Sequence, residues 1–216
     1  MRKLKLALAF ASACALLVGC AAPRSVMDQG WTQKPAKVKV VFTEPFIANP
    51  DDLMDDLPEY VNNFSDWYKT QLEANLGSQT NGVLYSVQKI SQDQIKFEAA
   101  AVRGVNIKVP RITEMEKEAD VYLVINDIWI GRTQSETTCS TGAGFGGIGM
   151  STTCSSQNYF TGKGNYAYFD PKTGKRLGYG DFEAQSSYTF AVSQSDWLNV
   201  VEESVSSMLD NTPIKQ

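Results

Sequence analysis

Apolar and polar residues alternate in several short stretches of this chain, and each such stretch predicts a β-strand. Over residues 37–42, every second position is apolar, which predicts a strand with one buried side and one wet side. The same alternation recurs over 83–90. Residues 120–130 are almost continuously apolar and β-branched, which is typical of a strand covered on both faces at the centre of a sheet. Two further strands, 159–169 and 176–188, are joined by a turn with proline and glycine, which predicts a hairpin.

Two other stretches follow helical periodicity. The first covers about 57–76, where Asp56 and Glu59 have the spacing of a capping box and Gly77 is the expected end. Its buried stripe is predicted to consist of Leu57, Val61, Phe64, Tyr68 and Leu72. The second covers about 196–210, with a serine just before it as N-cap. Its predicted inward residues are Trp197, Val201, Val205 and Met208.

Residues 91–119 give mixed signals. They are consistent with a short helix over 92–102, a strand over 105–109 and a helical turn over 112–119. The order of all these elements predicts an α/β (α+β) fold, in which a mixed β-sheet of about five strands has helices packed on one face.

A long apolar run lies near the start of the chain. Three basic residues, Arg2, Lys3 and Lys5, accompany an apolar stretch over 4–18, which is shorter than the about 20 residues that span a bilayer. Residues 17–20, Leu-Val-Gly-Cys, resemble the bacterial lipobox, so we expect cleavage before Cys20 and attachment of lipid to that residue. The alternative is an ordinary signal peptide that is cut nearby.

The chain is accordingly divided into a lipoprotein signal peptide (1–19), a flexible tether (20–36) and a single α/β sandwich domain (37–212) with a loop insertion (132–157). Trp31 is expected to be exposed in the tether. Ala21 follows the lipidated cysteine and is not aspartate. By resemblance to enteric lipoproteins, this favours the inner leaflet of the outer membrane, facing the periplasm.

Charge excludes some partners. Removal of the signal peptide leaves 17 basic against 24 acidic residues, a net charge of −7. This sign argues against nucleic acid and against adhesion to anionic lipid through a basic patch. No second apolar run of 18 residues is present in the sequence, so attachment to the membrane is expected to depend on the lipid.

The cysteines agree with export. Cys14 leaves with the signal peptide and Cys20 carries the lipid, so Cys139 and Cys154 remain and are expected to form a disulfide. A metal site built on these two thiolates is the rival interpretation. It is disfavoured because the chain has no histidine and only Glu136 offers a nearby carboxylate.

Residues 132–157 are rich in serine, threonine and glycine and lack apolar periodicity, so we expect a glycine-rich loop closed by the disulfide. Phe145, Ile148 and Met150 lie near its tip and are the candidate contact residues for a protein or membrane surface; an inert tip is the alternative. Residues 142–147 match G-x-G-x-x-G. A dinucleotide site needs that motif between a strand and a helix, and neither is predicted beside it.

The sequence contains little that favours catalysis or a bound cofactor. The absence of histidine excludes triads and metal sites that use it, and no serine nucleophile motif is present. A hydrolase that uses two carboxylates stays open as an alternative. The acidic residues of 51–59 lack the spacing of a calcium-binding EF-hand and suit the start of a helix. We therefore expect no enzyme activity, no cofactor and no bound metal.

One family resemblance lies in the second half of the chain. Ala119 leads into an apolar strand that ends at Gly131, a glycine-rich insertion contains 147–149, and a later strand closes on 170–175 (Asp-Pro-Lys-Thr-Gly-Lys). On these residues the chain resembles small envelope lipoproteins of the TolB amino-terminal-like group, including the curli secretion lipoprotein. The resemblance implies an α/β sandwich that serves periplasmic secretion, transport or assembly machinery without catalysis.

The resemblance also has a limit. Channels of the curli type extend membrane-spanning hairpins from the sandwich, which require runs of about 10 residues that alternate between apolar and polar. Residues 133–157 lack this alternation, which argues against a pore. We therefore expect a lipid-anchored periplasmic lipoprotein that binds other envelope proteins in an auxiliary or structural role. The alternatives are an oligomeric secretion channel, and hence a homo-oligomer, or a lipoprotein that binds a glycan or another small ligand.

Overall fold

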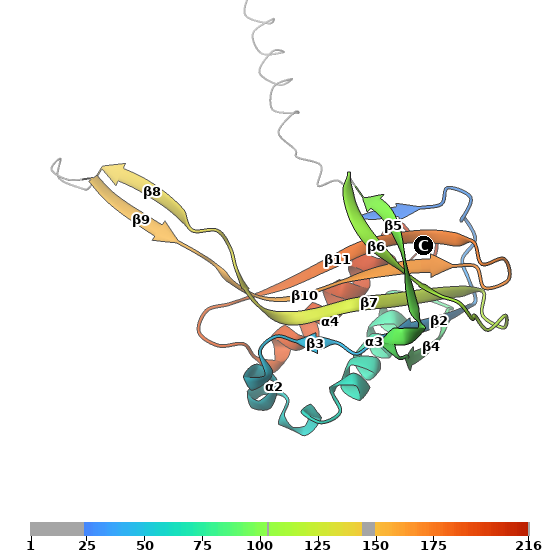
Figure 1. Cartoon of the computed structure of the whole chain (residues 1–216). Helices are drawn as coiled ribbons and strands as arrows, with labels where there is room; N and C mark the ends of the chain where they lie inside the picture. The colour runs from blue at the N-terminus through green and yellow to red at the C-terminus, as the bar shows by residue number, and fades with distance from the viewer. Residues whose placement is uncertain (1–23, 103, 144–149, 216) are drawn as a thin grey trace, which may run out of the picture.

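The computed structural model describes residues 24–102, 104–143 and 150–215 of the chain. A mixed sheet of seven strands is its centre, with strand order β1-β11-β10-β7-β2-β4 and β3 paired beside β7 (Figure 1). β2 is parallel to β4 and β7, whereas β10 is antiparallel to β7 and β11. The sheet strands are β1 (Ser25–Met27), β2 (Lys37–Phe42), β3 (Phe46–Ile47), β4 (Leu84–Lys89), β7 (Val121–Gln134), β10 (Asn158–Phe169) and β11 (Arg176–Tyr188). The predicted fold class is confirmed, with more strands than the five expected.

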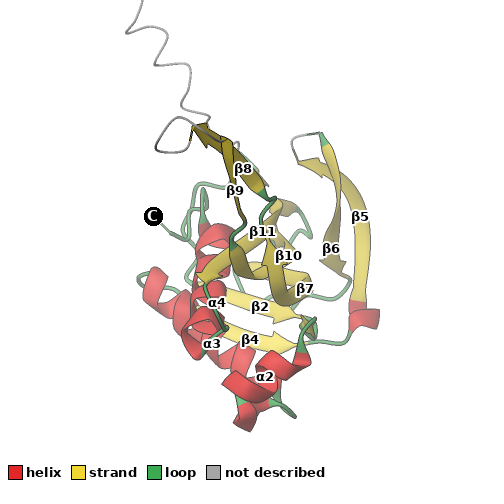
Figure 2. Ribbon diagram, turned by 90° about the vertical axis from the view of Figure 1, so that its left-hand side faces the viewer, coloured by secondary structure: helices red, strands yellow, loops and turns green. Residues whose placement is uncertain are grey.

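Three α-helices cover one face of the sheet: α2 (Pro50–Asp56), α3 (Phe64–Gln79) and α4 (Gln194–Leu209) (Figures 1 and 2). The main apolar core lies between these helices and the sheet. Trp197 of α4 is at its centre, with ring centroids 4.6 Å from Phe160 of β10. Gly162 of β10 allows α4 to pack close to the sheet, because a Cβ at this glycine would lie 2.4 Å from Val200 of α4. The predicted stripe of α4 is buried, and Ser193 forms a capping box with Asp196.

The first predicted helix is divided in the structure. α2 precedes it, a 3₁₀ turn, η1 (Pro58–Tyr60), follows, and α3 begins only at Phe64. Leu57 has φ −135°, because the residue before a proline avoids helical geometry. Gly77 does not end α3, which continues to Gln79. In the predicted stripe Val61 is exposed, while the other four members are buried.

A β-hairpin covers half of the opposite face of the sheet (Figure 2). It consists of β5 (Ile95–Val102) and β6 (Val105–Ile112), preceded by a 3₁₀ turn, η2 (Gln92–Gln94). The helix expected over 92–102 and the helical turn expected over 112–119 are therefore wrong, whereas the strand expected at 105–109 is present and longer. The hairpin packs on Val41 of β2, which is 3% exposed, so the outer side of this strand is not wet as predicted.

Part of the segment expected to be a flexible tether is ordered. β1 pairs with β11 at the edge of the sheet, and Trp31 packs on Tyr168 with 5.1 Å between ring centroids. Gly178 of β11 makes room for Met27 of β1, because a Cβ at this glycine would lie 2.2 Å from the methionine Sδ. The sequence pattern does not show this notch, which forms only when the two strands meet. The tether interpretation is therefore wrong for residues 25–36.

Candidate interaction surface

The segment expected to be a glycine-rich loop is a second β-hairpin. Its strands are β8 (Thr138–Ala143) and β9 (Met150–Ser155), which pair antiparallel from Thr138 opposite Ser155 to Ala143 opposite Met150. The hairpin extends well away from the body of the domain (Figure 1). The expectation of an irregular loop over 132–157 is wrong for these strands, and β7 also continues into this segment as far as Gln134.

The expected disulfide is present in the hairpin. Cys139 and Cys154 face each other across the two strands, with 4.0 Å between Cα atoms and an S–S distance of 2.03 Å. Both side chains are exposed. The bond therefore joins strands that are already paired, at a position where the domain core gives no support.

The candidate contact residues belong to the part of the sequence that follows β8, up to the first residue of β9. Phe145 and Ile148 lie outside the described residues, so their role stays a prediction. Met150 begins β9, and its side chain is likewise outside the description. Gly142, the first glycine of the G-x-G-x-x-G match, lies within β8, and the chain returns as strand β9. This is a hairpin, whereas a dinucleotide site needs a strand followed by a helix.

The base of the hairpin is hydrogen-bonded where β7 and β10 end. The Ser135 amide donates to the Gln157 carbonyl at 2.9 Å, and the Gln157 amide donates to the Ser135 hydroxyl at 2.8 Å. The Gln134 side chain donates to Asn158 Oδ1 at 3.2 Å. These contacts continue the pairing of the sheet to the start of the hairpin.

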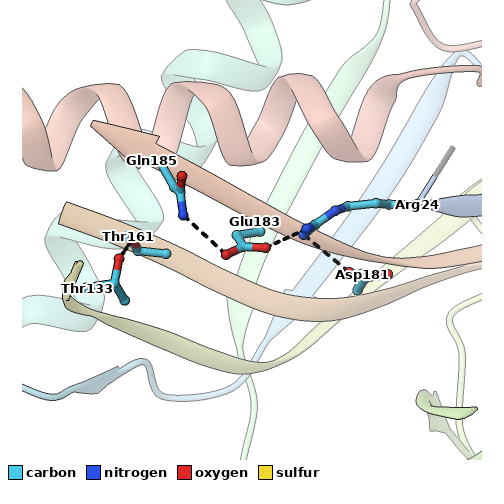
Figure 3. Close-up of polar contacts among 6 residues, drawn as sticks. All are labelled: Arg24, Thr133, Thr161, Asp181, Glu183 and Gln185. Atoms are coloured by element: carbon cyan, nitrogen blue, oxygen red, sulfur yellow. Dashed lines mark hydrogen bonds and ion pairs between the residues drawn. The ribbon is translucent and has the colours of Figure 1, made fainter. Parts of the chain in front are cut away.

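Next to the base of the β8–β9 hairpin, the outer face of the sheet is not covered by the β5–β6 hairpin. Arg24 lies across β11, where its guanidinium pairs with Asp181 at 3.4 Å and with Glu183 (Figure 3). Gln185 donates to the same glutamate at 3.3 Å. A shallow depression of about 260 Å³ lies next to Arg24. This open face is therefore polar and carries side chains from adjacent strands.

A wider trough of about 620 Å³ lies on the other half of the outer face, over β2 and β4. Tyr122 is the one aromatic residue among the described residues that line it, and its hydroxyl accepts a hydrogen bond from the Glu116 amide at 2.7 Å. Burial is the largest influence on the pKa of Tyr122 and raises it. The remaining lining is aliphatic, polar and charged, with Lys39 as its basic residue, which differs from the aromatic pocket expected for a glycan.

The acidic stretch at 51–59 has structural contacts. Asp52 is buried and accepts from Arg132 of β7, with 2.8 Å between the guanidinium Nε and Oδ2. Asp56 accepts from the Trp197 indole at 3.0 Å, and burial is the largest cause of its raised pKa. These contacts fasten α2 to the sheet and to α4. Within 24–102, 104–143 and 150–215, no three cysteine or acidic side chains are grouped closely enough to hold a metal ion.

Two observations bear on the membrane and on the other tryptophans. None of the described helices has the length and apolar character needed to span a bilayer. Trp67 and Trp197 are buried, and for Trp197 this confirms the predicted inward position. Trp129 is partly buried, with Lys163 Nζ 4.5 Å from its ring centroid on the open outer face.

Comparison with known proteins gives structural similarity without a family. No protein family matches the sequence, and no curated protein matches it. A homolog of neuraminyllactose-binding hemagglutinin from Helicobacter pylori is similar over 85% of this chain and 88% of that one, with 13% identity and a TM-score of 0.38. A PelC variant dodecamer from Paraburkholderia phytofirmans is similar over 88% of this chain and 96% of that one, with 10% identity and a TM-score of 0.37.

Proposed function

We propose that this protein is a lipid-anchored lipoprotein of the cell envelope, which binds other envelope proteins without catalysis. It would serve as an auxiliary or structural component of a secretion, transport or assembly system. The lipid would be attached to Cys20, and the domain would face the periplasm from the inner leaflet of the outer membrane. The lipobox pattern supports the anchor, and the Cys139–Cys154 disulfide supports an oxidising compartment.

The β8–β9 hairpin is the observation that carries the binding role. An isolated two-stranded hairpin is at best marginally stable in water, and this one extends from the body with its described side chains exposed. A covalent bond between Cys139 and Cys154 nevertheless keeps its strands together. The fold does not need this hairpin, yet a covalent bond stabilises it. Contact with another protein best explains such a segment.

The test is cross-linking in cells, followed by extraction in mild detergent and mass measurement. Thr138→Lys places a charge on an exposed hairpin position, and Ala74→Lys places the same charge on exposed α3 as the matched control. We expect a hetero-complex with the unaltered chain and the α3 variant, and its loss with the hairpin variant. A complex that survives Thr138→Lys together with loss of the disulfide would overturn the binding role of the hairpin. Cys20→Ala serves as the unanchored control.

An oligomeric secretion-channel lipoprotein of the curli type is the second candidate. One observation favours it: β8 and β9 pair as strands of a hairpin, although the sequence shows no apolar alternation there. The same experiment separates the candidates, because a discrete homo-oligomer of many subunits supports the channel, while a hetero-complex supports the auxiliary role.

A further inference from the structure

The chain enters the described fold at one edge of the main sheet. β1 begins at Ser25, five residues after Cys20, and five extended residues span at most about 17 Å. β1 is the terminal strand of the sheet order. A lipid on Cys20 therefore holds this edge close to the membrane surface, because the chain between them is too short for a long reach.

The tip of the β5–β6 hairpin lies next to this edge. The Tyr179 hydroxyl of β11 donates to the Ala101 carbonyl near the end of β5 at 3.2 Å. In the sheet register, Tyr179 is directly opposite Val26 of β1. Figures 1 and 2 are related by rotation about the vertical axis, and both show the β5–β6 tip at the top, on the side away from α2 and α3.

Apolar side chains are exposed at this place. Val105, the first residue of β6, is 65% exposed, and Val26 of β1 is 42% exposed. A single exposed valine needs no explanation. These two, however, belong to separate elements and lie on the part of the molecule that the anchor brings nearest to lipid.

The charge of the hairpin differs from that of the whole chain. β5 and β6 contain three basic residues, Lys96, Lys108 and Arg111, against one acidic residue, Glu98. Glu98 is paired with Arg111 at 3.0 Å and with Arg176 of β11 at 3.2 Å. The two lysines form no ion pair with any described residue. Lys96 and Arg111 face each other at the base of the hairpin, whereas Lys108 lies opposite Ala99, closer to the tip. Among the described residues of β5 and β6, Lys108 is therefore the basic side chain placed to meet anionic headgroups, a local exception to the net charge of −7 that argues against a basic patch.

From this placement we infer that the tip of the β5–β6 hairpin and strand β1 form the surface that rests on lipid headgroups beside the anchor. The inference rests on the proposed function, because it takes the lipid on Cys20 as its starting point. It orients the domain, with α2 and α3 directed away from the membrane. The β8–β9 hairpin extends toward the same side in both views, so its partner would be met at the membrane surface.

The test uses the lipidated full chain in vesicles of phosphatidylethanolamine and phosphatidylglycerol. Val105→Cys supplies a single free thiol for a polarity-sensitive fluorophore, because the disulfide and the lipid occupy the other mature cysteines. Ala74→Cys on α3 is the matched control. We expect a blue-shifted emission and several-fold stronger quenching by spin-labelled lipid at position 105 than at position 74.

The charge of the hairpin is tested in the same labelled protein. Lys108→Glu is expected to lower the apparent association of the tip with anionic vesicles by at least about fivefold, the value for removal of one basic charge near the surface. Lys172→Glu, on the exposed turn after β10, changes the net charge equally and should leave the quenching unchanged. An equal effect of both substitutions would contradict a local contact.

The mass of the purified chain separates failure of this inference from failure of the proposed function. An acylated chain with equal quenching at positions 105 and 74 would overturn the membrane-facing surface alone. A chain without acyl groups on Cys20 would overturn both proposals.

Discussion

The two hairpins that extend from this sheet are stabilised in opposite ways. The β5–β6 hairpin lies against the sheet, and Val109, Ile112 and Ile95 are buried in a second apolar cluster with residues of β2, β7 and β10. The β8–β9 hairpin extends away from the sheet and has a disulfide between its strands. Burial and covalent linkage are alternatives here: the disulfide is found where the described side chains of the hairpin are exposed.

The greatest loss of stability is expected from a substitution in the buried side of the β5–β6 hairpin. Val109→Asp would place a carboxylate at a position that is 0% exposed, so we expect the free energy of unfolding to fall by about 3 kcal/mol or more. Val105→Asp in the same strand is the control and should change it by less than about 0.5 kcal/mol. Urea denaturation measures both. Equal losses would show that the hairpin does not depend on its buried side.

The next effect concerns the disulfide. Replacing Cys139 and Cys154 by serine opens a loop with a sequence separation of 15, which the chain-entropy model values at about 3 kcal/mol. We expect this loss to be confined to β8–β9, seen as faster hydrogen exchange of its amides, while β5–β6 exchanges as before. Loss of the whole far-UV circular dichroism signal on mild reduction would contradict the separation of the two regions.

A smaller effect is expected from the two ion pairs of Glu98, one with Arg111 inside the β5–β6 hairpin and one with Arg176 that joins the hairpin to β11. Glu98 is 41% exposed, and Glu98→Gln should reduce stability by about 0.5–1 kcal/mol, because exposed pairs are screened by water. The difference should shrink at high salt. Glu73→Gln, which removes a single exposed pair with Lys69 on α3, is the control with a smaller expected loss. A loss above that of Val109→Asp would assign the attachment to charge.

Acid is expected to change the pairing of β8 and β9 least, in contrast to the contacts of α4. Burial opposes ionisation of Asp196 in α4, but hydrogen bonds from Ser186 and Ser193 outweigh it and hold the pKa of this carboxyl below its ordinary value. Its contribution is therefore present above the unfolded pKa of about 4 and is lost as pH falls through the lower folded pKa. Residues 138–155 contain no acidic or basic side chain, so their pairing should not change. Hydrogen exchange of the α4 and β8–β9 amides, measured over a pH series and corrected for the intrinsic exchange rate, tests this difference.

The sequence predicted the elements whose apolar residues recur at a regular period. The strand at β2 and the helix at α4 follow from apolar positions that repeat at the period of each element, and both are present. The disulfide was also predictable, because the lipobox and the signal peptide left two cysteines. These inferences required only local pattern or counting.

The missed elements depend on contacts that a local pattern does not record. The described side chains of β8 and β9 are exposed, and no apolar period marks these strands in the sequence. β5 contains Ala99-Ala100-Ala101, which favours a helix by propensity, yet packing against the sheet makes it a strand. β1 is three residues long, and its partner β11 is far away in sequence.

The polar surface beside the hairpin was out of reach for the same reason. Arg24 meets Asp181 across a sequence separation of 157 residues, which no motif or spacing marks. The contact residues proposed from the sequence, Phe145 and Ile148, lie outside the described part of the chain, so the structure neither supports nor opposes them.

The length of β7 has a mechanical consequence. This strand runs for 14 residues from the middle of the sheet to the base of the β8–β9 hairpin, and β10 accompanies it in antiparallel register. A pull on the hairpin along its axis would draw β7 and β10 in the same direction, so the ladders that join them to β2 and β11 would be loaded in shear and many hydrogen bonds would have to break together. With the partner and the anchor proposed above, tension would pass from β10 through β11 to β1 without first unravelling the sheet.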